Sequence, residues 1–365
     1  MEKKVLIKEN TFGNIEFVSS LRVVSVILIV LYHSLCFYAG IWWFLRTEVV
    51  PLWRFLAYPI VEIGLTVFVF ISGFLYGYLY FHKGKYRNSI QFWEVKVKRL
   101  LIPYIFWGCI WILIMPNNCG SWPYLFSGIA HLWFLLALFD IFFIVFILIR
   151  IGIIKCSTDI WNKIVDIIII LISFSLVYLW SYYSNHHYIL AFEHALFYLP
   201  MFITGFFYAK YGIYMHIDSI IYSIFLFVGL MSLFSLSYYN IPTNSTLYRV
   251  PSIVIACSLV SLLCDIKQNS IVAKFVSTMD TKSMGIYIFN QFVVFGLLFI
   301  PSVNSFFCSH FYIGPFCIFI VSYMIPWIFA VFFSKYKILS WTIGQYQRRI
   351  IPSKPVSAPN NNVRE

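Results

Sequence analysis

The recurrence of apolar stretches about 20 residues long constrains this chain more than any other feature. These stretches run from Phe17 to Phe333 and are separated by short polar segments. About 20 apolar residues in a helix cross the ~30 Å hydrocarbon layer of a bilayer. The sequence therefore predicts an all-α integral membrane protein, a bundle of about ten transmembrane helices. We place the spans at residues 18–39, 54–80, 100–115, 128–149, 164–183, 191–209, 218–237, 249–264, 283–301 and 312–333.

Composition agrees with a membrane domain and argues against separate soluble domains. The chain is 61% hydrophobic and only 11% charged, whereas soluble domains carry about 25% charged residues. No polar segment between the spans is long enough to fold by itself. We therefore expect one membrane domain over residues 1–340 and a cytoplasmic tail over residues 341–365, with a disordered Pro/Ser/Asn-rich end.

The net charge of +12 is explained by topology. If the N-terminus is cytoplasmic, 22 of the 26 Lys and Arg residues fall in cytoplasmic segments, and only Arg46, Arg54 and Arg249 fall on or near the outer side. This asymmetry follows the positive-inside rule and places both termini in the cytoplasm. Nucleic acid is not an expected partner. Residues 91–100, which mix aromatic and basic side chains, are expected to form an interfacial helix on anionic headgroups.

The eight cysteines are scattered, with no C-x-x-C pair. Cysteines within apolar spans behave as small apolar residues. We therefore expect no metal site and no disulfide framework.

The first span carries two ionisable residues, Arg22 and His33. An ionisable group inside a span costs several kcal/mol unless it is paired or hydrated, so each one indicates a functional site. Eleven residues at ~100° each bring the two side chains to within about 20° of one direction, ~16 Å apart along the axis. Considered singly, Arg22 is also compatible with a snorkelling anchor, and His33 with a hydrogen bond between packed helices.

Other polar residues are predicted at the depth of His33. Glu62 enters the second span from the outer side, and a carboxylate that orients an imidazole is the arrangement that general-base chemistry needs. Span ends tolerate polar groups, so each residue alone is also compatible with an interfacial position. Together they predict a hydrated cavity that opens to the outer side, lined by His131, Asp140, Glu193 and His194 as well.

Four motifs, in order, resemble those of the membrane acyltransferase-3 family. Residues 22–33 read RVVSVILIVLYH, an Arg followed by ten residues and a His. Residues 68–75 read FVFISGFL, residues 96–104 read KVKRLLIPY and residues 131–135 read HLWFL. The resemblance covers residues 16 to 340. Many members read Tyr-x-x-His late in the chain, where this sequence has Asn290, which can hydrogen-bond but cannot carry a proton at neutral pH.

The resemblance implies a ten-helix enzyme that transfers an acyl group, usually acetyl from cytoplasmic acetyl-CoA, to a hydroxyl of a cell-surface or lipid-linked glycan. His33 would be the catalytic histidine, and Arg22 the cation for the acyl donor. Lys98 and Arg99 would face the donor's phosphates, and Ser72 and Gly73 would permit close helix approach or line a pore. We expect a multi-pass protein of the plasma or inner membrane, with polysaccharide-assembly proteins as further partners.

Three other functions compete with this interpretation. A flippase or polysaccharide exporter would use buried charges and a hydrated cavity equally well, but it predicts two related halves with broken helices, which the sequence does not show. A glycan polymerase would be expected to have a large outer loop. A purely structural subunit would not need Arg22 and His33 on one helix face.

Overall fold

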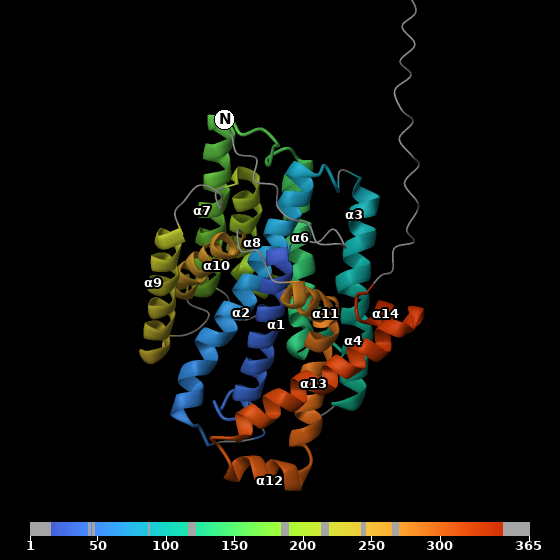
Figure 1. The fold of residues 1–365 in the computed structure, drawn as a ribbon. Coiled ribbons are helices and arrows are strands. Elements are labelled where there is room, and N and C mark those ends of the chain that lie inside the picture. Colours follow the sequence, from blue (N-terminus) through green and yellow to red (C-terminus); the bar gives the residue numbers. More distant parts are fainter. Residues whose placement is uncertain are drawn as a thin grey trace, which may run out of the picture.

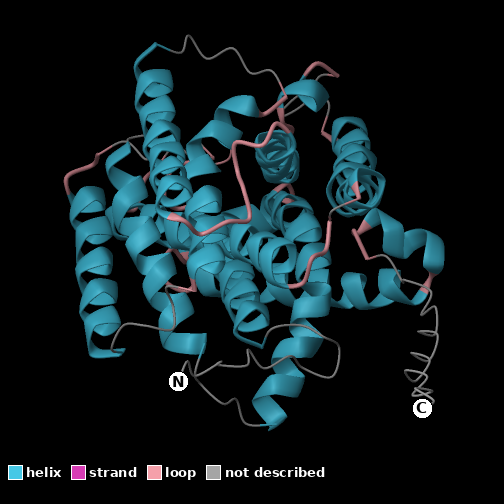
Figure 2. Cartoon of the chain, turned by 90° about the horizontal axis from the view of Figure 1, so that it is seen from above, coloured by secondary structure: helices cyan, strands magenta, loops and turns pink. Residues whose placement is uncertain are grey.

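The computed structural model covers the whole chain, and the structure describes residues 16–42, 45, 48–86, 88–115, 122–183, 190–212, 219–241, 246–264 and 270–345. The predicted disordered end of the tail and both termini lie outside the described residues. Within them every regular element is a helix (Figure 2).

The helices follow one another with short connections (Figure 1). In chain order they are α1 (Glu16–Cys36), α2 (Pro51–Gly77), the π-helical segment η1 (Tyr78–His82), α3 (Ser89–Lys96), the π-helical segment η2 (Val97–Leu101), α4 (Ile102–Ile114), α5 (Tyr124–Ser127), the 3₁₀-helix η3 (Ala130–Leu132), α6 (Trp133–Arg150), α7 (Ile160–Tyr183), α8 (Phe192–Tyr211), α9 (Ser219–Tyr238), the 3₁₀-helix η5 (Thr246–Tyr248), α10 (Arg249–Cys264), α11 (Ser270–Leu298), α12 (Pro301–Ser309), α13 (Gly314–Lys335) and α14 (Lys337–Thr342).

Seven segments of the described chain are long and apolar enough to cross a membrane, and an eighth is formed if α11 and α12, bent by 91°, count as one span. Each of the ten predicted spans contains a helix, but α8 and α10 do not meet that test. At 16 residues, α10 is about 24 Å long, shorter than the hydrocarbon layer. α8 carries Glu193, His194 and Lys210 and is buried along most of its length. The ten-span topology stays a prediction.

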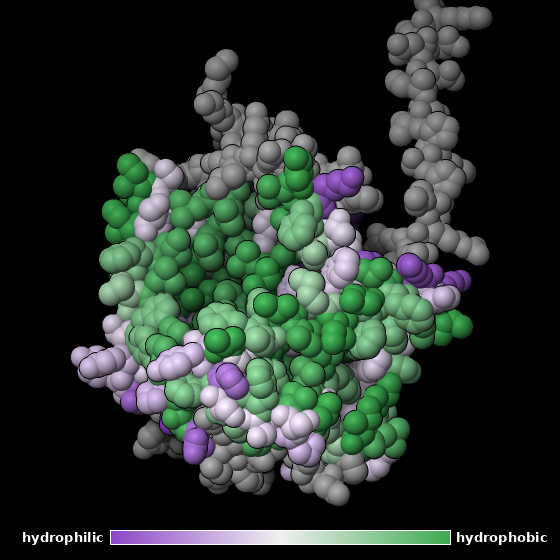
Figure 3. All heavy atoms as spheres, turned by 60° about the horizontal axis from the view of Figure 1, so that its bottom comes forward, coloured by the Kyte–Doolittle hydropathy of each residue, from purple (hydrophilic) through white to green (hydrophobic). Residues whose placement is uncertain are grey.

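Burial separates central from peripheral helices. The most apolar windows of α1 and α2 are each 61% buried, whereas those of α7 and α9 are 17% buried. The exposed side chains of α7 and α9 are mainly Ile, Leu, Val and Phe, and Figure 3 shows hydrophobic side chains over much of one face of the molecule. α1 and α2 therefore form the centre of the bundle, while α7 and α9 present the apolar surface that a lipid environment favours.

The segment after η1 differs from its sequence prediction. Residues 91–100 do not form a separate interfacial helix, because α3 continues through η2 into α4, and together they make one candidate span, Ser89–Ile114. This span contains the basic residue Lys96, and the aromatic rings around its ammonium group explain how the charge is tolerated. Its Nζ lies 3.3 Å from the ring centroid of Phe142 and within 6 Å of three further aromatic rings, those of Tyr76, Tyr86 and Phe92.

A buried ion pair attaches the peripheral helix α7 to the bundle. Asp166 on α7 accepts hydrogen bonds from the ammonium of Lys210 and from the hydroxyl of Tyr211 on α8. The side chains of Asp166 and Lys210 are 2% and 1% exposed. Because neither charge can reach solvent, separating α7 from α8 would leave both charges unpaired in a medium of low dielectric constant.

α2 and α8 cross so closely that only glycine fits at the contact. A Cβ atom on Gly73 would lie 2.1 Å from the carbonyl oxygen of Phe202, and one on Gly205 would lie 2.2 Å from that of Phe70. Gly77, one helical turn after Gly73, meets the backbone at Phe206 in the same way. The Gly-x-x-x-Gly spacing puts both glycines of α2 on one face, which is the usual means of close helix approach in membranes.

We predict that Gly73→Ala lowers the melting temperature of the purified protein in lipid nanodiscs, because the added methyl group collides with backbone that cannot rotate away. Overpacking of this kind costs about 1–3 kcal/mol. Gly296→Ala on α11 is the matched control, since no heavy atom lies within 4 Å of its added Cβ. Equal melting temperatures for wild type and Gly73→Ala would contradict the close crossing.

Candidate active site

A cavity of about 380 Å³ lies among the central helices. Its lining comes from six parts of the chain that are distant in sequence: α1, α2, the η3–α6 junction, α8, α10 and α11. Aromatic and ionisable side chains predominate. They are Tyr32 and His33 of α1, Tyr58 and Glu62 of α2, His131, Trp133 and Phe134, Glu193, His194, Phe197 and Tyr198 of α8, Arg249 of α10, and Tyr287 of α11.

Helical periodicity accounts for the way each element contributes. On α2, Tyr58, Glu62 and Leu65 recur at intervals of four and three residues, which is one face of an α-helix. On α8, Phe197 and Tyr198 follow Glu193 and His194 by four residues each, so the four side chains lie on one face of that helix. The cavity thus brings together five of the residues predicted from the sequence: His33, Glu62, His131, Glu193 and His194.

His33 is held by Asn290, and this bond determines its tautomer. The two atoms His33 Nδ1 and Asn290 Oδ1 are 2.5 Å apart. The amide Nδ2 of Asn290 donates to the carbonyls of Ile286 and Tyr287 on its own helix, so its Oδ1 is the atom that faces the imidazole. His33 Nδ1–H is therefore the donor, and Nε2 keeps the lone pair that a base requires.

His131 approaches His33 from a distorted turn. Ala130, the residue before it, has φ +44°, and η3 ends where α6 begins. The backbone N–H of His131 donates to Gln291 Oε1, and its Nε2–H donates to the carbonyl of Ile288. The two imidazole rings lie 6.0 Å apart, edge to face. Their tautomers are opposite, because His33 donates through Nδ1 and His131 through Nε2.

The sequence predicted that Glu62 orients the imidazole of His33, but Glu62 pairs with Arg249 instead. Its Oε2 accepts a hydrogen bond of 2.6 Å from Nη1 of Arg249, and the two side chains are 4% and 3% exposed. The guanidinium of Arg249 also lies 4.9 Å from the ring centroid of Tyr198. The sequence placed Arg249 on or near the outer side and did not predict its pairing with Glu62. The available signal was that Arg249 opens a predicted span, where an ionisable residue needs a partner.

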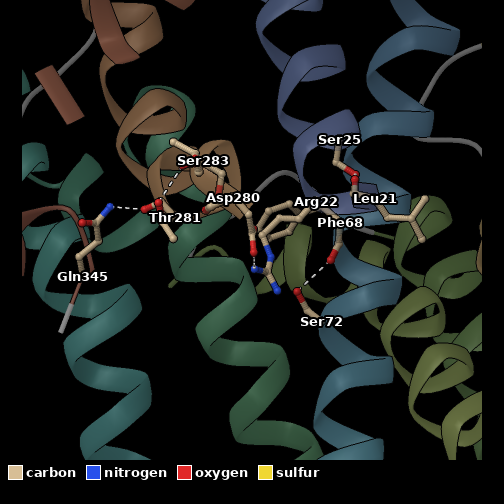
Figure 4. Close-up of polar contacts among 10 residues, drawn as sticks. Leu21, Arg22, Ser25, Phe68, Ser72, Asp280, Thr281, Ser283 and Gln345 are labelled. Carbon is tan, nitrogen blue, oxygen red and sulfur yellow. Dashed lines mark hydrogen bonds and ion pairs between the residues drawn. The ribbon is translucent and has the colours of Figure 1, made fainter. Parts of the chain in front are cut away.

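Arg22 lies on the same helix as His33 but outside the cavity lining, near the other end of α1. Its guanidinium Nη1 is 2.6 Å and 2.8 Å from the two carboxylate oxygens of Asp280 on α11. Figure 4 shows the two side chains pointing toward each other. The side chain of Arg22 is 27% exposed and that of Asp280 4%. Sequence reasoning missed Asp280 because it placed that residue before the start of a span, whereas α11 begins at Ser270.

The remaining predicted site residues lie away from the cavity. Ser72 Oγ donates to the carbonyl of Phe68, and Gly73 is packed against α8. Asp140 does not line the cavity, and its Oδ2 is buried without a hydrogen bond within the described part of the chain. Lys98 pairs with Glu94 at 2.5 Å along its helix, and Arg99 is exposed next to it.

Comparison with known families identifies the class of protein. Residues 15–335 match a family model described as an acyltransferase domain. The chain therefore belongs to this family of membrane acyltransferases, and the resemblance noted in its four motifs is confirmed. With its long apolar helices, it is a multi-pass membrane protein. Neither the curated proteins nor the solved structures gave a match.

We predict that Asn290→Leu lowers the rate of acyl transfer at least roughly tenfold, part of the 10²–10⁴-fold that a positioned general base contributes. Without Oδ1, nothing holds the proton on His33 Nδ1. Asn290→Asp keeps an oxygen in that place and should retain more activity than Asn290→Leu. Rates are normalised to the amount of protein in the membrane. Equal losses in the two variants would show that Asn290 acts through packing alone.

Proposed function

We propose that this protein is a membrane-embedded O-acyltransferase that transfers an acyl group, acetyl from acetyl-CoA, to a hydroxyl of a cell-surface or lipid-linked glycan. Its place is the plasma or inner membrane. The observation that carries the proposal is the arrangement of His33: this buried imidazole lines the cavity, its Nδ1 proton is held by Asn290, and its Nε2 carries the lone pair. The family to which the chain belongs supports the reaction type.

The chemistry of the transfer fits this arrangement. Nε2 of His33 accepts the proton of the acceptor hydroxyl as its oxygen attacks the thioester carbonyl. The tetrahedral intermediate collapses with cleavage of the C–S bond, and the proton passes from the imidazolium to the departing thiolate, so that ester and free thiol result. The step runs directly or through a transient acyl-enzyme. In the direct route the imidazole accepts and returns one proton; through an acyl-enzyme it would do so twice, first between the enzyme nucleophile and the departing thiolate, then between the acceptor hydroxyl and the released nucleophile.

The donor is assigned to the cytoplasmic side. Arg22 lies eleven residues, or ~16 Å, from His33 along α1, and it is partly exposed. Because Arg22 is paired with Asp280, the donor would meet a charge-neutral ion pair and not a lone cation. Lys98, which is partly exposed, and Arg99, which is exposed, are proposed to contact the phosphates of acyl-CoA. Polysaccharide-assembly proteins are further proposed partners.

We predict that His33→Ala abolishes O-acylation of the surface glycan while the glycan still reaches the cell surface. The measurement is NMR of purified glycan, which counts O-acyl groups in cells that carry wild type, a deletion or His33→Ala. Membrane levels of the protein are measured by immunoblot. His310→Ala is the matched control, because His310 is an exposed histidine at the end of α12 and should leave acylation unchanged.

A different result would favour the competing function. If the deletion strain keeps the acyl groups on its glycan but the glycan fails to reach the surface, the protein is an exporter. The role assigned to His33 would then be wrong as well.

A further inference from the structure

One part of the cavity lining combines aromatic rings with one closed ion pair. We define the acceptor wall as Glu62, Trp133, His194, Tyr198 and Arg249, all of which line the cavity. Trp133 packs against two rings of α8, with its centroid 4.1 Å from that of His194 and 6.0 Å from that of Tyr198. These two ring contacts fix the orientation of the indole in the wall.

The ion pair sets the charge that this wall can accept. Among the described residues that line the cavity, Arg249 is the one Lys or Arg. Its guanidinium is engaged by Glu62 at 2.6 Å, with both side chains nearly fully buried. An anionic ligand would therefore meet a cation that is already neutralised, and it would also face the carboxylates of Glu62 and Glu193.

The same pair is well suited to hydroxyl groups. A carboxylate accepts hydrogen bonds and a guanidinium donates them, so neighbouring hydroxyls of a sugar can bond to both at once. The indole of Trp133 and the phenol of Tyr198 supply apolar faces for the C–H side of the ring and a polar group at the edge. A lipid chain would use the aromatic groups but would leave the charged groups without partners.

On the basis of the proposed acyl transfer, we infer that the acceptor wall binds an uncharged sugar ring and discriminates against sugar carboxylates. Glu62 and Arg249 bond the hydroxyls, and Trp133 carries the apolar face. The residues that take part in binding thus differ from His33, which takes the proton. Glu62 and Arg249 are specificity-determining residues for the acceptor.

The test measures sugar binding with no acyl donor present. Full-length protein in lipid nanodiscs, free of sugar-based detergent, is titrated with the methyl glycosides of glucose, galactose and mannose and with the corresponding methyl uronosides. Saturation-transfer NMR reports weak binding and the ring protons that contact the protein. We expect at least one neutral glycoside to bind, and its uronoside to bind at least ten times more weakly.

Three variants separate recognition from stability. Trp133→Leu should abolish the signal, whereas Trp161→Leu, which changes an exposed tryptophan of α7, should not change it. Glu62→Gln should weaken binding of the neutral glycoside and strengthen binding of the uronoside, because it frees the guanidinium of Arg249 to pair with the carboxylate of the uronoside. A gain of uronoside binding cannot arise from misfolding.

The outcomes also distinguish this inference from the proposed function. No binding by any neutral glycoside, a uronoside that binds as tightly as its neutral counterpart to wild type, or no gain of uronoside binding in Glu62→Gln would overturn the inference. Each of these results leaves acyl transfer untouched, since that is measured on the glycan of living cells. Conversely, selective binding of a neutral sugar by a protein without transferase activity would support the inference about the acceptor wall and contradict the proposed acyl transfer.

Discussion

Two polar contacts between α1 and α11 fix the geometry on which the rest of the site depends. Arg22 pairs with Asp280, and His33 bonds to Asn290. Eleven residues separate the contacts on α1 and ten separate them on α11, which is ~15–16 Å on each helix. The two helices therefore run in the same direction and in register. Sliding one along the other would break both contacts at once, where little water can replace them.

The other buried charges follow the same logic. Glu62 with Arg249 joins α2 to α10, and Asp166 with Lys210 joins α7 to α8. The first pair joins helices that are far apart in the sequence, and the second holds α7, whose most apolar window is only 17% buried, on the next helix of the chain. In a bundle surrounded by lipid, the hydrophobic effect does not drive one helix against another. Buried polar pairs and close glycine contacts then select which helices pack together.

Periodicity along one helix was readable from the sequence, and contact between helices was not. The shared face of Arg22 and His33 needed only the 100° rotation per residue. The partners Asp280, Asn290 and Arg249 depend on which helices are adjacent and on where each helix begins. Glu62 is an example. The sequence predicted that it lies at the depth of His33, and both residues line one cavity. It did not predict that the carboxylate of Glu62 pairs with Arg249. Asn290 was singled out from the sequence, because it occupies the position where many relatives have a histidine, but its bond to His33 was not predicted.

The exposure of the polar groups differs along α1, and this difference bears on the route of the acyl group. Arg22 is 27% exposed at one end, whereas His33 is 8% exposed at the other. A donor bound at the level of Arg22, as we propose, would meet a partly exposed ion pair, and its acyl group would have to pass ~16 Å of helix to reach His33, the proposed base. α2 also reaches the Arg22 end of α1, since the ring of Phe74 lies 5.4 Å from that of Phe17, and the adjacent Gly73 packs against the backbone of α8. α2 is thus anchored near the proposed donor end of α1, and through Glu62 it lines the cavity that contains His33. The same two helices, α1 and α2, contribute to both ends of the route, so a path for the acyl group is most simply sought along their shared face.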